Sequence, residues 1–321
     1  MSRPLAIAIR LAFIALLAAL PYLVDTFWLN MLILALIYSL VVFSINVLTG
    51  FAGLLSFGQA GFVGAGAYTY GVLTVGGTSP GLAALAGIAL PTVLGFLLGL
   101  PAARLKGHYL AIGTLGFGVL MAQLLNNMVD VTRGPMGLLG IKSIGLSRTE
   151  WYYLLLAFAL VVMAGLTLLE RRAFLGVVMK SVKYDEVSAA ASGIGTFGVK
   201  LFVFSASAFL AGWCGIVLAA YMRFLTPDLF VPAESFRYLM MAVVGGGASP
   251  IGGLIAALGL TAVPELLRNL GETNVRLLIY GTMVLFVLWF VPGGIGGLID
   301  RYLGLRRPDI RSLAEPAERT A

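Results

Sequence analysis

Cysteine and histidine are almost absent from the sequence, which holds one of each, Cys214 and His108. A single cysteine rules out a disulfide within the chain and any metal site built from several thiolates. A lone histidine likewise rules out a metal site built from a cluster of imidazoles. We therefore expect no metal centre of either kind.

The motifs of nucleotide and acyl chemistry are missing too. The sequence has no G-x-x-x-x-G-K-[ST] loop, whose backbone would cradle the phosphates of a nucleotide. It has no G-x-S-x-G turn, and no combination of serine, histidine and acid stands out as a catalytic set. These absences argue against an enzyme and predict that the chain has no ATPase site of its own.

Charge is scarce, whereas hydrophobic residues are abundant. The 321 residues include 21 Lys+Arg and 14 Asp+Glu, and 60% are hydrophobic, against roughly 45–50% in soluble domains. A soluble surface of this size would need more charge. About 20 residues span a bilayer. The composition therefore predicts an all-α, polytopic transmembrane helix bundle with about 8–10 membrane segments, forming one domain over 1–321 with its membrane part at about 5–299.

Apolar runs long enough for a span begin near residue 5, and the first is expected to be a retained span. One region differs from the others. Within 237–270, a short apolar piece at 238–244 meets GGGASPIGG at 245–253, and a second piece follows at 254–267. Ten helical residues reach only about 15 Å, half a membrane. We expect a broken or re-entrant hairpin here, buried in protein or lining a cavity. The runs lie at about 5–24, 29–48, 54–75, 82–103, 108–128, 151–169, 199–220 and 277–299.

The few charges predict an orientation. With the N-terminus inside, the inner segments hold 14 of the 21 basic residues and seven of the acids, so the whole net charge of +7 falls on one side. Membrane proteins place their basic loops in the cytoplasm. Both termini, the loop at about 170–198 and the tail at 300–321 are therefore expected on the cytoplasmic side.

The largest loop on that side contains KSVKYDEVSAAASGIG at 180–195. Asp185 and Glu186 suit the start of a helix, where the helix dipole favours acids. The alanine-rich stretch 187–192 predicts a short helix that Gly193 or Gly195 can end. Such a helix is unstable alone and needs a groove to lie in, but the residues alone also allow an ordinary solvated connector.

Several blocks in this order resemble the permease subunits of branched-chain amino-acid ABC transporters, in particular the longer of the two permease types. The motif D-E-x-x-A-A-x-x-G at 185–193 carries the likeness first, followed by K-L…F…SA…AG…G…L over 200–218. The likeness covers about residues 30–300. The other blocks are LTGFAGLLSFGQAGFVGAGAY (48–68), RLKGHYLAIGTLGFG (104–118), SFRYLMMAVVGGGASPIGG…VPELLR (235–268) and R…YG…LF…PGGIGG (276–297).

The resemblance implies a division of labour among several proteins. This chain would translocate branched-chain or other hydrophobic amino acids, or related small solutes such as amides or urea, across the inner membrane. It would pair with a sister permease, two cytoplasmic ATPase subunits that bind the ATP, and a periplasmic solute-binding protein, with no cofactor of its own. The implied coupling helix, seated in an ATPase groove, comprises Asp185, Glu186, Ala189, Ala190 and Gly193.

Polar and glycine residues in the apolar runs are candidates for the translocation path. Ser56 and Gln59, three apart, would share a helix face, and a buried Gln normally points into a bundle. Backbone amides at Gly245, Gly246 and Gly247 could bind a substrate carboxylate, as half-helices of transporters do. Asn46 is a further buried polar candidate. The alternatives are helix packing for Ser56 and Gln59, and a hinge or packing turn for the glycines.

Two other classes of transport protein remain as alternatives. A stand-alone secondary carrier would place acids or histidines inside its spans for ion coupling, and charges near mid-span are absent here. The chain could also be the permease of a sugar or nucleoside ABC importer, in which case the partner binding protein would bind a sugar rather than an amino acid.

Overall fold

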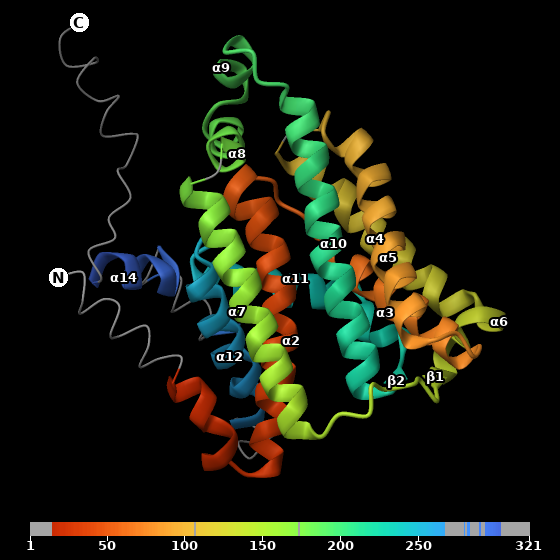
Figure 1. Ribbon diagram of the computed structural model, residues 1–321. Coiled ribbons are helices and arrows are strands. Elements are labelled where there is room, and N and C mark those ends of the chain that lie inside the picture. The colour runs from red at the N-terminus through yellow and green to blue at the C-terminus, as the bar shows by residue number, and fades with distance from the viewer. Residues whose placement is uncertain are drawn as a thin grey trace, which may run out of the picture.

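The computed structural model describes residues 15–105, 107–172, 174–266, 279, 281–282, 289 and 293–302. In this part of the chain most residues are helical, and five helices are long and apolar enough to cross a membrane (Figure 1). The expected all-α polytopic fold is therefore confirmed. Both termini and most of the run at 277–299 lie outside the described residues. The five spans are Thr26–Phe51, Pro80–Ala102, His108–Asn127, Arg148–Glu170 and Thr196–Met222.

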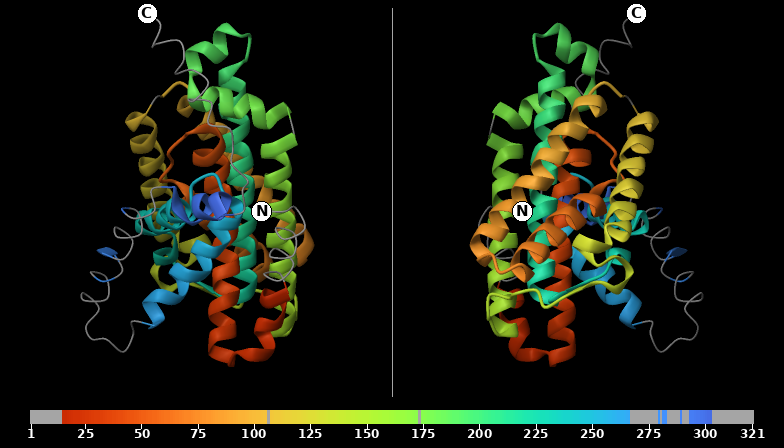
Figure 2. Two further views of the ribbon diagram at one scale, coloured as in Figure 1. Left: turned by 90° about the vertical axis from the view of Figure 1, so that its left-hand side faces the viewer. Right: turned by 90° about the vertical axis from the view of Figure 1, so that its right-hand side faces the viewer.

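Shorter helices and one small pair of strands connect these spans. The strands pair antiparallel, with Leu138 opposite Leu225, at the end of the bundle far from α8 and α9 (Figures 1 and 2). The elements are α2 (Thr26–Ile45), the π-helix η1 (Asn46–Phe51), α3 (Gln59–Val75), α4 (Pro80–Ala102), α5 (His108–Asn127), α6 (Val129–Thr132), η2 (Gly134–Met136), β1 (Leu138–Leu139), α7 (Arg148–Arg172), α8 (Phe174–Tyr184), α9 (Glu186–Ala191), α10 (Thr196–Met222), β2 (Phe224–Leu225), η3 (Pro227–Phe230), α11 (Pro232–Gly245), α12 (Pro250–Leu266) and α14 (Gly294–Tyr302).

Small residues bring α3, α4 and α10 into close contact. A Cβ added to Gly66 of α3 would lie 2.8 Å from the Cα atom of Gly212 in α10. A Cβ on Gly99 of α4 would lie 2.8 Å from a methyl carbon of Leu201. Lipid tails are as apolar as leucine, so membrane helices associate through such close packing rather than through a hydrophobic driving force. The glycines of these spans therefore hold the bundle together.

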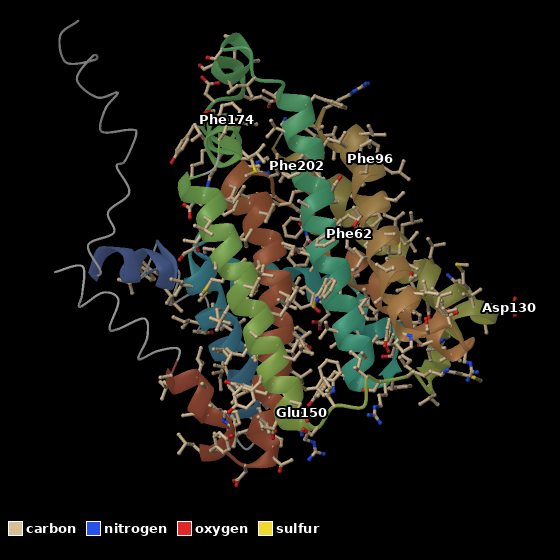
Figure 3. The ribbon with its side chains drawn as sticks, in the orientation of Figure 1. Phe62, Phe96, Asp130, Glu150, Phe174 and Phe202 are labelled. Carbon is tan, nitrogen blue, oxygen red and sulfur yellow. The ribbon has the colours of Figure 1, made fainter. Side chains whose placement is uncertain are left out.

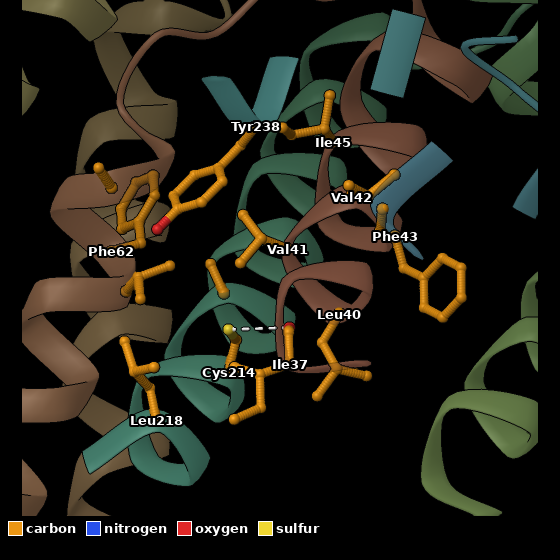
Figure 4. Packing of buried hydrophobic residues seen from close by; sticks show 14 of the residues in the cluster. Ile37, Leu40, Val41, Val42, Phe43, Ile45, Phe62, Cys214, Leu218 and Tyr238 are labelled. Atoms are coloured by element: carbon orange, nitrogen blue, oxygen red, sulfur yellow. Dashed lines mark hydrogen bonds between the residues drawn. The ribbon is translucent and has the colours of Figure 1, made fainter. Parts of the chain in front are cut away.

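Helix α2 runs through the middle of the bundle and is buried along most of its length. Figure 4 shows its apolar side chains meeting those of α3, α10 and α11, with Val41, Phe62 and Tyr238 close together. The thiol of Cys214 donates to the carbonyl of Ile37 at 3.3 Å, which fixes α10 against α2. Other side chains face outward, since Phe96 of α4 and Phe202 of α10 are exposed (Figure 3), as lipid-facing or partner-facing side chains are.

The run at 54–75 is not one continuous helix. After η1 the chain leaves the helical path, and α3 begins only at Gln59. Gly53 has a φ of 70°, which favours glycine. The expectation that Ser56 and Gln59 share a helix face is therefore wrong, because Ser56 precedes the helix.

The expected break near 245–253 is confirmed. Helix α11 ends at Gly245, Gly246 takes a left-handed φ of 100°, and α12 begins at Pro250. Both pieces are shorter than a membrane span, at 14 and 17 residues. In the described residues the bundle thus contains two interruptions, one after η1 and one between α11 and α12.

Candidate functional site

The short helix α9 has the ends that the sequence predicts. Asp185 is its N-cap, and Oδ1 of Asp185 accepts from the backbone N–H of Val187 at 2.9 Å and of Ser188 at 3.3 Å. The Ser188 hydroxyl, followed by these two amides, lowers the pKa of the Asp185 carboxyl. After the helix, Gly193 adopts a φ of 82°, the left-handed turn that commonly ends helices.

The two faces of α9 differ in exposure. Ala189 is buried against the rest of the chain, whereas Val187 is 70% exposed and Ala190 is exposed as well. Residues three apart lie on one side of a helix, so Val187 and Ala190 form a small apolar face directed away from the bundle. Figures 1 and 2 show α9 at the far tip of the molecule, beyond the ends of the long helices.

Lys200, in the first turns of α10, ties α9 to the bundle. Its Nζ lies 2.7 Å from Oε1 of Glu186 and donates to the carbonyl of Ala103, at the end of α4, at 3.3 Å. Only 4% of the Lys200 side chain is exposed, against 28% for Glu186. A buried ammonium needs such partners, so this ion pair fixes the position of Glu186 and therefore of α9.

A second lysine ties α8 to the first interruption. Nζ of Lys183 donates to the carbonyl of Gly50 in η1 at 2.6 Å. The same lysine, with Glu186 and Lys200, lines a cavity of about 240 Å³ that opens beside the irregular segment after η1. In the sequence, Lys183 counts only as cytoplasmic charge and Lys200 also belongs to the motif of the family resemblance, but neither pattern predicts these contacts.

The two interruptions of the bundle touch each other. A Cβ on Gly50 would lie 2.8 Å from the Cα atom of Ala248 and 3.2 Å from the carbonyl carbon of Gly247. Next to this contact, Asn46 is completely buried, and neither polar atom of its side chain has a partner in the part of the chain that the structure describes. An unpaired buried amide is costly, which makes Asn46 the polar candidate with spare hydrogen-bonding capacity.

Gln59 is fully engaged in the packing of three helices. Its Oε1 accepts from the Ser44 hydroxyl of α2 at 3.1 Å, and its Nε2 donates to the Ser207 hydroxyl of α10 at 3.0 Å. Ser207 in turn donates to the carbonyl of Ser44 at 2.8 Å. This arrangement supports the packing interpretation of Gln59, because a closed network leaves little for a passing solute.

Ser56 is buried too, and its hydroxyl accepts from the backbone N–H of Gly58 at 3.3 Å. It thus shapes the turn that leads into α3. Ser235 of α11 was not predicted as a site residue, and its hydroxyl accepts from the N–H of Ala60 at 2.9 Å and so caps α3. The serine opens the block SFRYLMM, but nothing local in that pattern indicates a cap for another helix.

The backbone amides that follow α11 already donate hydrogen bonds within the chain. The N–H of Gly246 donates to Val243 at 2.9 Å and that of Gly247 to Ala242 at 2.8 Å. Gly245 is in the helix and packs against Gly252 and Gly253 of α12. In this conformation the amides of Gly246 and Gly247 end α11 rather than face a carboxylate. Among the described residues, no group of three or more His, Cys, Asp or Glu could hold a metal ion.

The family pattern and the individual relatives that match this chain all belong to one family. The sequence pattern of the family described as "Branched-chain amino acid transport system / permease component" matches residues 27–288. The "High-affinity branched-chain amino acid transport system permease protein LivM" of Escherichia coli (strain K12) is 33% identical over 308 residues, covering 87% of this chain and 72% of that protein. Its namesake from Salmonella typhimurium (strain LT2) is 32% identical over 309 residues, with the same coverage. No solved structure gives a significant match. The chain belongs to the family of permease components of branched-chain amino acid transport systems.

Proposed function

We propose that the chain is one of two permease subunits of an ABC importer in the inner membrane. The other parts are a sister permease, two cytoplasmic ATPase subunits that bind the ATP, and a solute-binding protein on the outer side. The chain itself contributes the path and the docking helix, without an ATP site or a cofactor. Family membership supports the role of permease, and the missing phosphate loop supports separate ATPases.

The observation that carries the docking role is the exposed face of α9. A helix of six residues is unstable in isolation, yet α9 is capped at both ends, held by Glu186 and directed outward at the tip of the molecule. Its outward residues Val187 and Ala190 are small and apolar, which suits a shallow groove on a partner. We assign α9 and its flanking Asp185 and Gly193 as the contact with an ATPase subunit.

The proposed substrates are branched-chain amino acids and other small hydrophobic amino acids. Both relatives are named for branched-chain amino acid transport, and their similarity extends over most of this chain. The solute-binding protein would select the solute, so amides, urea-like compounds and sugars are alternatives that a binding measurement can separate.

The proposed path follows the interruption after η1. Asn46, whose amide has no partner among the described residues, stands at its start, Ser56 lies buried along it, and the cavity beside Lys183 opens at its end. The backbone of Gly245, Gly246 and Gly247 forms the opposite wall, where Gly247 meets Gly50. Gln59 stands outside this path as a packing residue, because Ser44 and Ser207 satisfy it.

The test begins with the solute-binding protein that delivers solute to this permease. Its melting temperature should rise with leucine, isoleucine or valine, and proteoliposomes with the whole complex should take up the same solute only when ATP is present. A complex that lacks this chain is the control and should not transport. Stabilisation by sugars alone, or uptake that needs no ATP, would overturn the proposal.

A further inference from the structure

The segment formed by α8 and α9 is joined to the rest of the chain by two lysines that act at different places. Lys200 holds α9 through Glu186 and reaches the end of α4 at Ala103. Lys183, in the last turn of α8, reaches the carbonyl of Gly50 in η1. One contact therefore attaches the segment to regular helices, and the other attaches it to the interruption.

The contacts of Lys200 hold α9 in a fixed position relative to α10. Its ammonium is buried and bonded to both a carboxylate and a carbonyl, so moving it away from these partners would leave a buried charge without compensation. Because α9 and the start of α10 share this ion pair, they are expected to move together when α9 is displaced.

The Lys183 contact ends on a part of the chain that can change shape. Gly50 lies in the last turn of a π-helix, where carbonyls have no partner within the helix, and single-turn π-helices occur often at functional sites. The Lys183 side chain also packs on Gly53, since a Cβ there would lie 2.9 Å from Cγ of Lys183. A side chain larger than that of glycine would not fit between them.

Gly50 extends the connection to the second interruption. Its backbone lies against Gly247 and Ala248, between α11 and α12, without room for a side chain. A continuous series of contacts therefore runs from α8 through Lys183 to Gly50 and on to Gly247. Such a series is evidence of a pathway only if displacement of one end changes the other, which is what the test below measures.

We propose that Lys183 is a positioning residue of the transport cycle, which transmits displacement of the α8–α9 segment to the interruption at Gly50 and Gly247, while Lys200 keeps α9 attached to α10. This inference rests on the proposed function, because the displacement is driven by ATPase subunits docked on α9. When α8 shifts, the bond from Lys183 pulls on the carbonyl of Gly50, and the close contact with Gly247 carries the shift to the far wall of the path.

Transport coupling in the reconstituted complex is the first test. Lys183→Met should keep ATP hydrolysis within about twofold of the unchanged complex but lower the uptake per ATP at least tenfold. Lys183→Arg, which can still donate to Gly50, should restore most of it. Lys180→Met is the matched control, since it removes the same charge from the same helix but from a pair with Glu170 of α7. Equal losses in Lys183→Met and Lys180→Met, or unchanged uptake per ATP in Lys183→Met, would overturn the inference.

A labelling experiment gives a readout that stability alone would not move. Leu55 is exposed and lines the cavity beside Lys183, and the native Cys214 is completely buried, so Leu55→Cys gives this chain one accessible thiol, whose labelling is read on this subunit. Its labelling rate should differ between the nucleotide-free and the vanadate-trapped complex, and Lys183→Met should abolish this difference while Lys180→Met keeps it. A difference that persists in Lys183→Met overturns the inference. If the unchanged complex neither transports nor hydrolyses ATP in response to substrate, the proposed function itself fails.

Discussion

Gly50 and Gly247 lie backbone to backbone, although almost 200 residues separate them, and a Cβ on Gly50 would fall 3.2 Å from the carbonyl carbon of Gly247. The contact joins the end of η1 to the turn between α11 and α12. It places the two interruptions of the bundle at one level, next to the buried side chain of Asn46 and near the segment that carries α9. Changes at this contact should therefore affect both the packing of the two interruptions and transport.

Gly50→Ala should impair both packing and uptake. The new methyl group would meet backbone atoms of Gly247 and Ala248, which cannot rotate away, and overpacking of this kind costs about 1–3 kcal/mol. Thermal unfolding of the purified complex and ATP-dependent uptake measure the two effects. Gly116→Ala is the control, because a Cβ there meets nothing within 4 Å and alanine favours a helix over glycine by about 1 kcal/mol. Equal behaviour of both variants would contradict the close contact.

Replacing the two buried amides should separate stability from transport. Gln59→Leu removes the bonds to Ser44 and Ser207, and each such buried hydrogen bond contributes about 0.5–1.5 kcal/mol to stability. The variant should unfold at a lower temperature and, once folded, keep its preference among substrates.

Asn46→Leu should show the opposite pattern. Neither polar atom of Asn46 has a partner among the described residues, so an apolar side chain of similar size should leave stability unchanged or raise it. Uptake should fall, because the path loses its spare hydrogen-bonding group. Normal uptake by Asn46→Leu would remove Asn46 from the path.

The ion pair between Glu186 and Lys200 should be tested by a double-mutant cycle. Glu186→Ala leaves the buried ammonium of Lys200 with the Ala103 carbonyl alone. Breaking a fully buried pair costs about 3–5 kcal/mol, and partial exposure of Glu186 reduces this to about 1–3 kcal/mol. Glu186→Ala combined with Lys200→Met should be less destabilised than the two single effects together. Strict additivity in thermal unfolding would show that the pair contributes nothing.

The cap of α9 should fail in acid. Hydrogen bonds from the Ser188 hydroxyl, and from the amides of Ser188 and Val187, lower the pKa of Asp185 in the folded chain. A lowered folded pKa means that the stabilisation is complete above the ordinary aspartate value of about 3.9 and is lost as the pH falls through the folded value.

Hydrogen exchange at the amides of Val187 and Ser188, corrected for the intrinsic effect of pH, measures this cap. Protection should persist at neutral pH and vanish below the folded pKa. Asp185→Asn, which keeps an acceptor at the N-cap, should remain partly protected and show no such pH dependence. Protection that is insensitive to pH in the unchanged chain would rule out the carboxylate as the cap.

Local patterns carried the sequence predictions that the structure confirms. Hydrophobic runs of membrane length predicted the spans, the glycine cluster at 245–253 predicted the break after α11, and Asp185 and Gly193 predicted the ends of α9. Each of these features depends on residues that are close in sequence, so composition and helix propensity are sufficient to predict it.

The relationships that were missed depend on distant parts of the chain. The three-residue spacing of Ser56 and Gln59 did not place both residues on α3. The conformation of Gly53 and the packing around the break keep Ser56 outside that helix. The bond from Lys183 to Gly50 and the cap that Ser235 provides for α3 join elements more than 100 residues apart. A lysine in a basic loop has the same local sequence pattern whether it faces water or a carbonyl. The residues next to Lys183 in the sequence therefore could not predict its bond to Gly50.

The central claim is that α9 couples ATP hydrolysis to import, and uptake by proteoliposomes with an Ala190→Trp complex tests it most directly. Ala190 is exposed on the outward face of α9. The bulky tryptophan side chain should therefore leave the chain folded and inserted in the membrane but prevent the ATPase subunit from docking on α9. Branched-chain amino acid uptake should fall at least tenfold relative to the unchanged complex, while the melting temperature of the isolated chain stays the same. Uptake equal to that of the unchanged complex would contradict the claim.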